Sequence, residues 1–300
     1  MNAHASDALI AALESSRAQF LELVADVRPD LHRYCARMTG SLADGEDVVQ
    51  DTLARAYFQL SELGALPPLR PWLFRIAHNR AIDQLRRNAH RATEPLDDAI
   101  DSAGDAAAQP EEALARRQAV QAAVSTFAGL PSTQRACVIL KDVLDESLDD
   151  IGVLLDMKLP AVKSALHRGR AALRERAGAT APRDATAPSA NLAQYARLFN
   201  ARDWDGIRAL LAADARLDLV SRRKLQGRDA VGVYFSNYDR TAGWRVAPGR
   251  IDGAEALLVW TGSAEQPAYF VQLEWHGMAL RAIRDFRYVP YVLQDWNAAR

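Results

Sequence analysis

An arginine-rich, aromatic stretch at residues 70–87 has the composition to hold a single strand of nucleic acid. It reads RPWLFRIAHNRAIDQLRR and follows a Pro-rich loop. Aromatic faces accept unstacked bases, and guanidinium groups hold phosphates. Helical spacing predicts that Trp72, Phe74 and Ile76 pack inward. The side chains expected to face outward are Arg75, Asn79, Arg80, Arg86 and Arg87. An amphipathic core helix with a solvated basic side would give the same pattern. We expect this helix both to pack against the core and to offer its basic side to nucleic acid.

A second basic stretch, residues 147–176, has the pattern of two helices joined by a tight turn at 156–159. The second of these helices should begin near Pro160, which suits a first helical turn. Its inner face is expected to carry Val162, Ala165, Leu166 and Leu173. Its outer face would then present Lys163, Ser164, His167, Arg168 and Arg170. This is helix-turn-helix geometry, in which the second helix enters the major groove of DNA.

An acidic helix is predicted at residues 43–57, ADGEDVVQDTLARAY. Asp44, Asp47 and Asp51 are spaced i, i+3, i+7, which places three carboxylates on one face. Glu46 adds a further acid near the start of the helix. Acids are also favoured at a helix N-terminus by the helix dipole alone, so this face by itself has a structural explanation.

Two linkers divide the chain of 300 residues. Residues 93–110 are acidic and 178–190 are rich in Pro, Ala, Thr and Ser, both typical of solvated connections. We therefore expect folded domains at 17–92, 111–177 and 191–300. The net charge of −1 argues against coating nucleic acid through bulk charge but allows local basic faces. We expect two separate basic helices, connected by the acidic linker, to bind the same stretch of DNA.

Metal, redox and membrane roles are not expected. Cys35 and Cys137 have no ligand partners nearby and sit at apolar positions, so we expect reduced core cysteines. His167 lacks a second ligand one helical turn away. No apolar run approaches ~18 residues, and residues 1–16 lack the features of a signal peptide. We expect a cytoplasmic protein without a cofactor or metal.

The last third changes character, from helices to a run of strands. Helices are predicted from residue 191 and around Trp204, followed by strands at 216–220, 244–251, 256–261, 268–275 and 280–288. A helix at 229–238 interrupts them, and residues 222–224 read as an exposed turn. This order indicates an α+β fold with an antiparallel sheet. Asp218, Asp252, His276 and Asp285 are acid–base candidates by type only, and a surface or structural role is favoured for each.

Taken together, the acidic and arginine-rich segments resemble regions 2.2 to 2.4 of extracytoplasmic-function (ECF) sigma factors, over about 50 residues. The resemblance implies that Asp47, Gln50 and Asp51 lie against the β′ clamp helices of core RNA polymerase. It implies that the loop 63–70 and Asn79 read a flipped base of the melted −10 promoter element. Arg75, Arg80, Arg86 and Arg87 would contact the DNA backbone nearby.

The segment from Leu130 to Glu175 resembles sigma region 4, again over about 50 residues. The resemblance makes the run from Lys163 to Arg168 the reader of the −35 element. Arg170 and Arg174 would contact phosphates or the polymerase β flap. The turn DMKLP departs from the commoner Gly-Ser/Thr form, so the sequence does not specify the angle at which the recognition helix enters the DNA groove.

Residues 191–300 resemble the SnoaL-like branch of the nuclear-transport-factor-2 and ketosteroid-isomerase superfamily, a cone-shaped α+β fold, by pattern rather than by a specific motif. The expected protein is thus multidomain, with two all-α sigma domains and a C-terminal SnoaL-like domain that regulates them. Two kinds of ligand are considered for that domain: a small molecule and another part of the chain. Two alternatives are a SnoaL-like isomerase or cyclase with appended DNA-binding helices, and a ligand-sensing helix-turn-helix regulator. Only the sigma-factor interpretation explains the acidic helix, the arginine-rich helix and the helix-turn-helix in that order. It predicts no enzyme activity.

Overall fold

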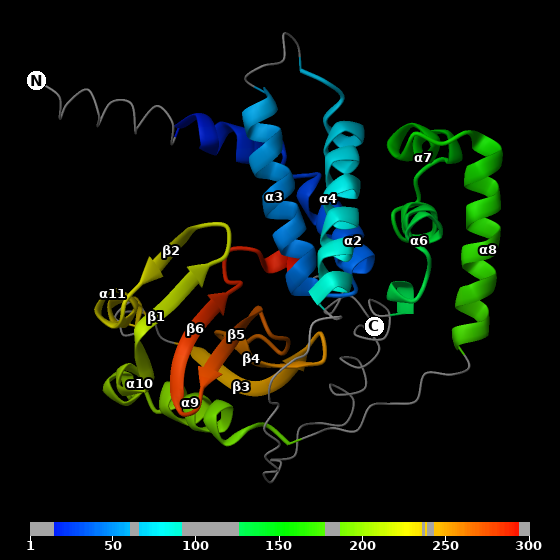
Figure 1. The fold of residues 1–300 in the computed structure, drawn as a ribbon. Helices are drawn as coiled ribbons and strands as arrows, with labels where there is room; N and C mark the ends of the chain where they lie inside the picture. The colour runs from blue at the N-terminus through cyan, green and yellow to red at the C-terminus, as the bar shows by residue number, and fades with distance from the viewer. Residues whose placement is uncertain are drawn as a thin grey trace, which may run out of the picture. The chain divides into compact units, whose positions relative to one another are not determined.

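The computed structural model describes residues 15–60, 66–91, 126–177, 187–235, 238 and 243–293. The chain divides into two compact units (Figure 1). The first contains the described residues up to 91 and those from 126 to 177, and the second contains those from 187 onward. The predicted acidic linker, residues 93–110, lies outside the described residues.

The first unit begins with three packed helices, α2 (Arg28–Thr39), α3 (Leu42–Leu60) and α4 (Leu69–Arg91). Pro29 stands in the first turn of α2, where its missing N–H costs nothing. Gly40 ends that helix at φ 83°, a left-handed conformation in which its N–H bonds the Ala36 carbonyl. Leu31, Tyr34 and Val49 are buried where the helices meet. Helical spacing in the sequence predicted α3 and α4 correctly.

The second half of this unit contains α6 (Ser132–Val138), a π-helical turn (Ile139–Val143), α7 (Leu148–Leu155) and α8 (Leu159–Ala177). Ser147 caps α7 by accepting a hydrogen bond from the Asp150 N–H at 3.1 Å. Asp156, at φ 55°, ends α7 and turns the chain toward α8. A Cβ on Gly169 would lie 2.7 Å from Val138 Cγ2, so this glycine lets α8 approach α6 closely.

The two halves of the helical unit share one hydrophobic core. Helix α2 packs against α6 and the π-helical turn, and α4 packs against α7. Tyr34 and Phe74 belong to the same buried cluster as Cys137 and Ile151. The predicted boundary between domains 17–92 and 111–177 stays a prediction, but in this state the halves are in contact. Cys35 and Cys137 are buried free thiols, in agreement with the sequence.

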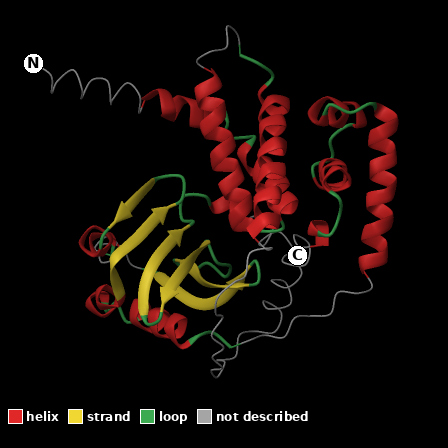
Figure 2. Ribbon diagram, in the orientation of Figure 1, coloured by secondary structure: helices red, strands yellow, loops and turns green. Residues whose placement is uncertain are grey.

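The second unit is an α+β domain with one six-stranded sheet in the order β2-β1-β6-β5-β4-β3 (Figure 2). Its elements are α9 (Ala190–Asn200), α10 (Trp204–Leu210), β1 (Leu211–Leu219), β2 (Arg223–Gln226), α11 (Arg228–Tyr234), β3 (Trp244–Ile251), β4 (Ala254–Thr261), β5 (Tyr269–His276), β6 (Ala279–Asp285) and a 3-10 turn (Pro290–Leu293). Helix α9 packs against β3 and β4, while α11 packs against β1 and β2. The fold class is as expected.

Two details of the sheet were predicted wrongly. The sheet is mixed rather than antiparallel, because β1 and β6 pair in parallel, with Leu217 opposite Ile283. Of the segment 222–224, expected as an exposed turn, Arg222 lies in the turn, whereas Arg223 and Lys224 begin the exposed strand β2, where Arg223 pairs with Leu219. A basic run on an edge strand has the composition of an exposed turn, since one side of an edge strand faces solvent. None of the helices in the described part of the chain is long and apolar enough to cross a membrane.

Candidate nucleic-acid interface

Helix α4 presents a basic face, and its opposite face is packed. Leu73, Phe74, Ala77 and Ala81 are buried along one side of the helix. The exposed residues on the other side are Arg75, Asn79, Arg86 and Arg87. A packed apolar face fixes the helix on α2 and α3, so its cationic side chains are held on a rigid support.

Arg80 differs from the other arginines predicted to face outward. Its side chain is only 13% exposed. One terminal nitrogen lies 2.8 Å from Asp51 Oδ2, and the other lies 3.0 Å from Asp83 Oδ2. The expectation that Arg80 points freely outward was wrong, because two carboxylates bind its guanidinium.

The acidic face of α3 is divided between exposed and buried groups. Asp47 and Asp51 are exposed, as a polymerase contact would require. Glu46 is fully buried and pairs with Arg28 at 3.1 Å. The Gln50 amide donates to Glu46, which orients it. Glu46 therefore fastens α3 to the start of α2, a role that sequence spacing did not reveal.

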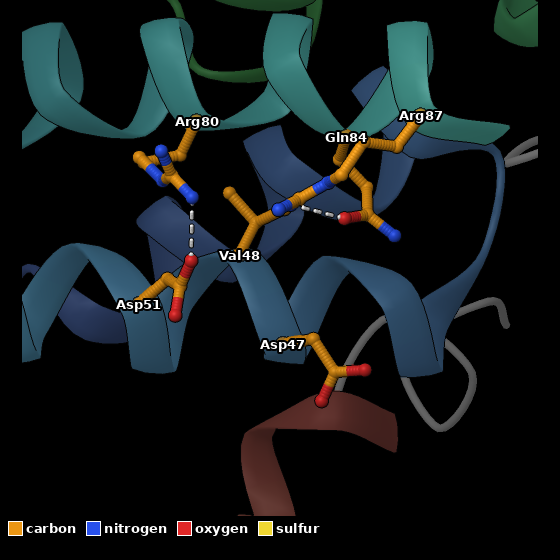
Figure 3. A pocket seen from close by; sticks show the side chains of 6 residues that line it. All are labelled: Asp47, Val48, Asp51, Arg80, Gln84 and Arg87. Carbon is orange, nitrogen blue, oxygen red and sulfur yellow. Dashed lines mark hydrogen bonds and ion pairs between the residues drawn. The ribbon is translucent and has the colours of Figure 1, made fainter. Parts of the chain in front are cut away.

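A cleft of about 300 Å³ lies between α3 and α4 (Figure 3). Its lining consists of Asp47, Val48, Asp51, Arg80, Gln84 and Arg87. Arg87 is tethered there, since its Nη2 donates to Gln84 Oε1 at 2.6 Å. The structure thus brings the acids predicted to meet polymerase next to two arginines predicted to meet DNA.

Behind this face, α4 is joined to α2 by a polar contact. The Tyr34 hydroxyl lies 2.7 Å from His78 Nδ1. Burial lowers the pKa of His78, which keeps the imidazole neutral at pH 7. The hydroxyl can then donate to the unprotonated Nδ1. Protonation would replace this acceptor by a donor, so the contact depends on pH.

Helix α8 is held as the second helix of a helix-turn-helix. Val162, Ala165 and Leu166 are buried, and Leu173 is partly buried. All five residues expected on the outer face are exposed: Lys163, Ser164, His167, Arg168 and Arg170. Periodicity therefore predicted the two faces correctly, and α8 has the packed back and free polar front of a groove-reading helix.

Two of the exposed arginines on α8 are oriented by neighbours. Arg168 Nη1 donates to Ser164 Oγ at 2.6 Å, one turn earlier. Arg170 forms a two-pronged pair with Asp142, at 2.9 Å from Nε and 2.5 Å from Nη2. The hydrogen bonds that Arg170 donates to the Asp142 carboxylate raise the pKa of Arg170. Asp142 is 28 residues away in sequence, so no local pattern pointed to it.

In the second unit, Asp285 is a fully buried carboxyl with internal partners. The Tyr234 hydroxyl donates to Oδ2, and the Arg287 N–H donates to Oδ1 at 2.9 Å. Tyr238 lies 2.5 Å from the Tyr234 hydroxyl. Burial raises the pKa of Asp285, and these hydrogen bonds partly oppose the rise. Both oxygens are satisfied from within the domain, which favours a structural role.

The other acid–base candidates of this unit have partners and exposures that differ from those of Asp285. Asp218 pairs with Lys224 across β1 and β2 at 3.5 Å, and His276 is exposed at the end of β5. Asp252 has a φ of 56° in the turn after β3. Within the described residues, no group of three or more His, Cys, Asp or Glu side chains could hold a metal ion. The structure does not assemble these candidates into one site.

The helical unit has the two modules of a sigma factor. Residues 23–91 match the family model Sigma-70 region 2, and residues 121–173 match Sigma-70, region 4. The ECF RNA polymerase sigma factor SigF of Caulobacter vibrioides is 32% identical over 169 residues, which cover 56% of this chain and 90% of the relative. The chain belongs to the ECF sigma factors.

Longer relatives and solved structures resemble the chain as well. ECF sigma factor SigG of Mycobacterium tuberculosis is 30% identical over 231 residues, 67% of this chain. The chain covers 61% of the length of SigG. The crystal structure of M. tuberculosis SigJ, an extracytoplasmic function sigma factor, aligns over 88% of this chain and 95% of that one, with 17% identity and a TM-score of 0.36.

Proposed function

We propose that this chain directs core RNA polymerase to promoters with −35 and −10 elements and opens the DNA near −10. One observation carries the proposal. Two helices, α4 and α8, each expose a basic face on a packed apolar back, and an acidic face on α3 lies beside the first. A lone helix-turn-helix regulator needs only α8, so it leaves the other two faces without a use.

Helix α8 is the proposed reader of the −35 element. Its residues nearest to DNA would be Lys163, Ser164, His167 and Arg168. Arg170, paired with Asp142, is better placed for a phosphate or the β flap than for a base edge. Phosphate contacts would position the helix, and side chains on base edges would give specificity.

Helix α4 is the proposed contact for the melted −10 region. Asn79 would read a base, and Arg75, Arg86 and Arg87 would hold backbone. Since Arg80 is bound by Asp51 and Asp83, we assign it to holding α3 against α4. Asp47, Gln50 and Asp51 are the proposed contacts with the β′ clamp helices.

The second unit is proposed as a SnoaL-like regulatory domain without catalytic activity. The full burial of Asp285 and its internal hydrogen bonds support this, because a general base must come within hydrogen-bond reach of a substrate. Its ligand would be a small molecule or another part of the chain. We place the whole protein in the cytoplasm, with polymerase and the chromosome.

The test is addition of the purified chain to core polymerase on a promoter template. Promoter-dependent transcripts are expected, and Arg168→Ala should reduce them. Arg216→Ala is the matched control, because Arg216 is exposed on β1 of the other unit. Sequence-specific binding to duplex DNA without polymerase, and no transcripts with it, would instead identify an ordinary regulator.

A further inference from the structure

A small hollow of about 270 Å³ lies on the second unit, where β1 begins and where β5 turns into β6. Ala212 and Ala279 supply its apolar lining, and the polar side chains that line it are Asp214, His276 and Arg281. A hollow of this size suits a small ligand of a few heavy atoms. The chemistry of the lining decides which ligand it can take.

Irregular strand pairing builds this hollow. Arg281 is an extra residue on β6, because the residues before and after it pair with two consecutive residues of β5. On the other side of β6, the pairing with β1 is interrupted between Leu211 and Arg216, and this stretch contains Asp214. A bulge leaves its residue out of the ladder and changes the direction of its side chain, and bulges are common beside functional sites. The two interruptions therefore supply the two charged side chains of the hollow.

Asp214 and Arg281 face each other without forming a hydrogen-bonded ion pair. Arg281 Nε lies 3.7 Å from Asp214 Oδ2, which is longer than a hydrogen bond. The Arg281 side chain is 46% exposed and that of Asp214 is 58% exposed. Within the described residues, neither side chain has a hydrogen-bond partner. Because an exposed pair of this kind contributes little to stability, a ligand that separates the two charges loses little.

Both strand ends that carry the lining are anchored through backbone carbonyls. Asn191 on α9 donates to the Gly277 carbonyl at 2.8 Å, next to His276. Arg228 on α11 donates from Nε to the Leu211 carbonyl at 2.9 Å, at the start of β1. Anchoring of this kind reduces the ordering that the binding of a ligand would require.

We propose that this hollow binds a small zwitterion of the α-amino-acid class. The guanidinium of Arg281 donates two hydrogen bonds to the ligand carboxylate, and the ligand ammonium donates to the carboxylate of Asp214. In an α-amino acid a single carbon atom separates the two charged groups, a spacing comparable to that between Arg281 and Asp214. Asp214 repels a simple anion and Arg281 repels a simple cation, so a ligand that carries both charges complements the site. The neutral imidazole of His276 offers one further donor and one acceptor.

Met278 is a natural reporter for this site. It is 70% exposed and lies in the turn between His276 and Ala279, which both line the hollow. The chain has four methionines, so their isotope-labelled methyl groups can be followed by NMR in the full chain. Met38, fully buried in α2, is the internal control. The probe is L-alanine, compared with L-alaninamide, which lacks the carboxylate, and with N-acetyl-L-alanine, which lacks the ammonium group.

L-alanine should shift the Met278 signal until it saturates and should leave the Met38 signal in place. Each derivative should bind at least about tenfold more weakly, because each leaves one charged side chain without its partner. No saturable shift with L-alanine, or equal affinity for all three compounds, would overturn the proposal. The measurement needs neither polymerase nor DNA, so the binding does not rest on the proposed function.

Two substitutions place the binding in the hollow. Arg281→Gln and Asp214→Asn should each weaken L-alanine binding about tenfold. Their matched controls are Arg223→Gln and Asp205→Asn, which remove the same charges from other exposed positions of the second unit and should change little. Unchanged affinity in both Arg281→Gln and Asp214→Asn would overturn the proposal, because L-alanine would then bind elsewhere.

Discussion

Replacing Ile151 by alanine should show whether the helical unit has one core or two. Ile151 is fully buried in α7, which contacts α4 on one side and α8 on the other. The change deletes three carbon atoms, worth about 0.8 kcal/mol each in transfer from water. The unfilled space adds to this, and comparable core truncations cost 2–5 kcal/mol. We expect a loss of about 3–4 kcal/mol in the free energy of unfolding.

Trp72 makes the test specific to the first half. In a chain ending at Ala179 it is the only tryptophan, and it packs against the shared core from α4. Urea unfolding followed by Trp72 fluorescence should shift to lower urea by about 1.5–2 M in Ile151→Ala, for a slope near 2 kcal/mol/M. The unfolding transition followed by circular dichroism should shift by the same amount. Val153→Ala, at a position 63% exposed on the same helix, should change little. A Trp72 transition that stays in place while circular dichroism shifts would refute the shared core.

Three further outcomes are expected. Arg168→Ala should weaken promoter binding by the holoenzyme about 5- to 100-fold with core binding intact, and an unchanged −35 footprint would remove this residue from the reading helix. Burial lowers the pKa of His78 in the folded chain, so the unfolded chain binds a proton at a higher pH than the folded chain does. The free energy of unfolding should therefore fall as the pH drops below about 6.5. His78→Gln should flatten that dependence between pH 7.5 and 5.5, and an equal slope in both proteins would assign it to other groups. Truncation after Ala179 should alter transcription without abolishing core binding, and a truncated chain unable to bind core polymerase would show that the second unit is required.

Faces of helices could be predicted from the sequence because apolar periodicity reports burial. The buried Val162, Ala165 and Leu166 alternate with exposed basic residues at 3.6-residue spacing. The strand Trp244–Ile251 was also predicted with its observed bounds. Within the described residues, Asp47 and Asp51 are exposed on α3 as expected.

Contacts between residues far apart in the sequence could not be predicted from local spacing. Arg135 binds a backbone carbonyl 97 residues away, and a carbonyl has no sequence signature. The pairing of Arg80 with Asp83 could have been inferred from their i, i+3 spacing, but the pairing with Asp51 depends on how α3 crosses α4. The parallel pairing of β1 with β6 was missed because strand patterns do not specify which strands become neighbours.

The most direct test of the central claim is to sequence the RNA 5′ ends made by core polymerase reconstituted with this chain on genomic DNA. We predict 5′ ends at sites that share one −35 and one −10 sequence, with loss of the −35 preference in Arg168→Ala. The same 5′ ends from core polymerase alone, or ends without a shared upstream sequence, would contradict the account.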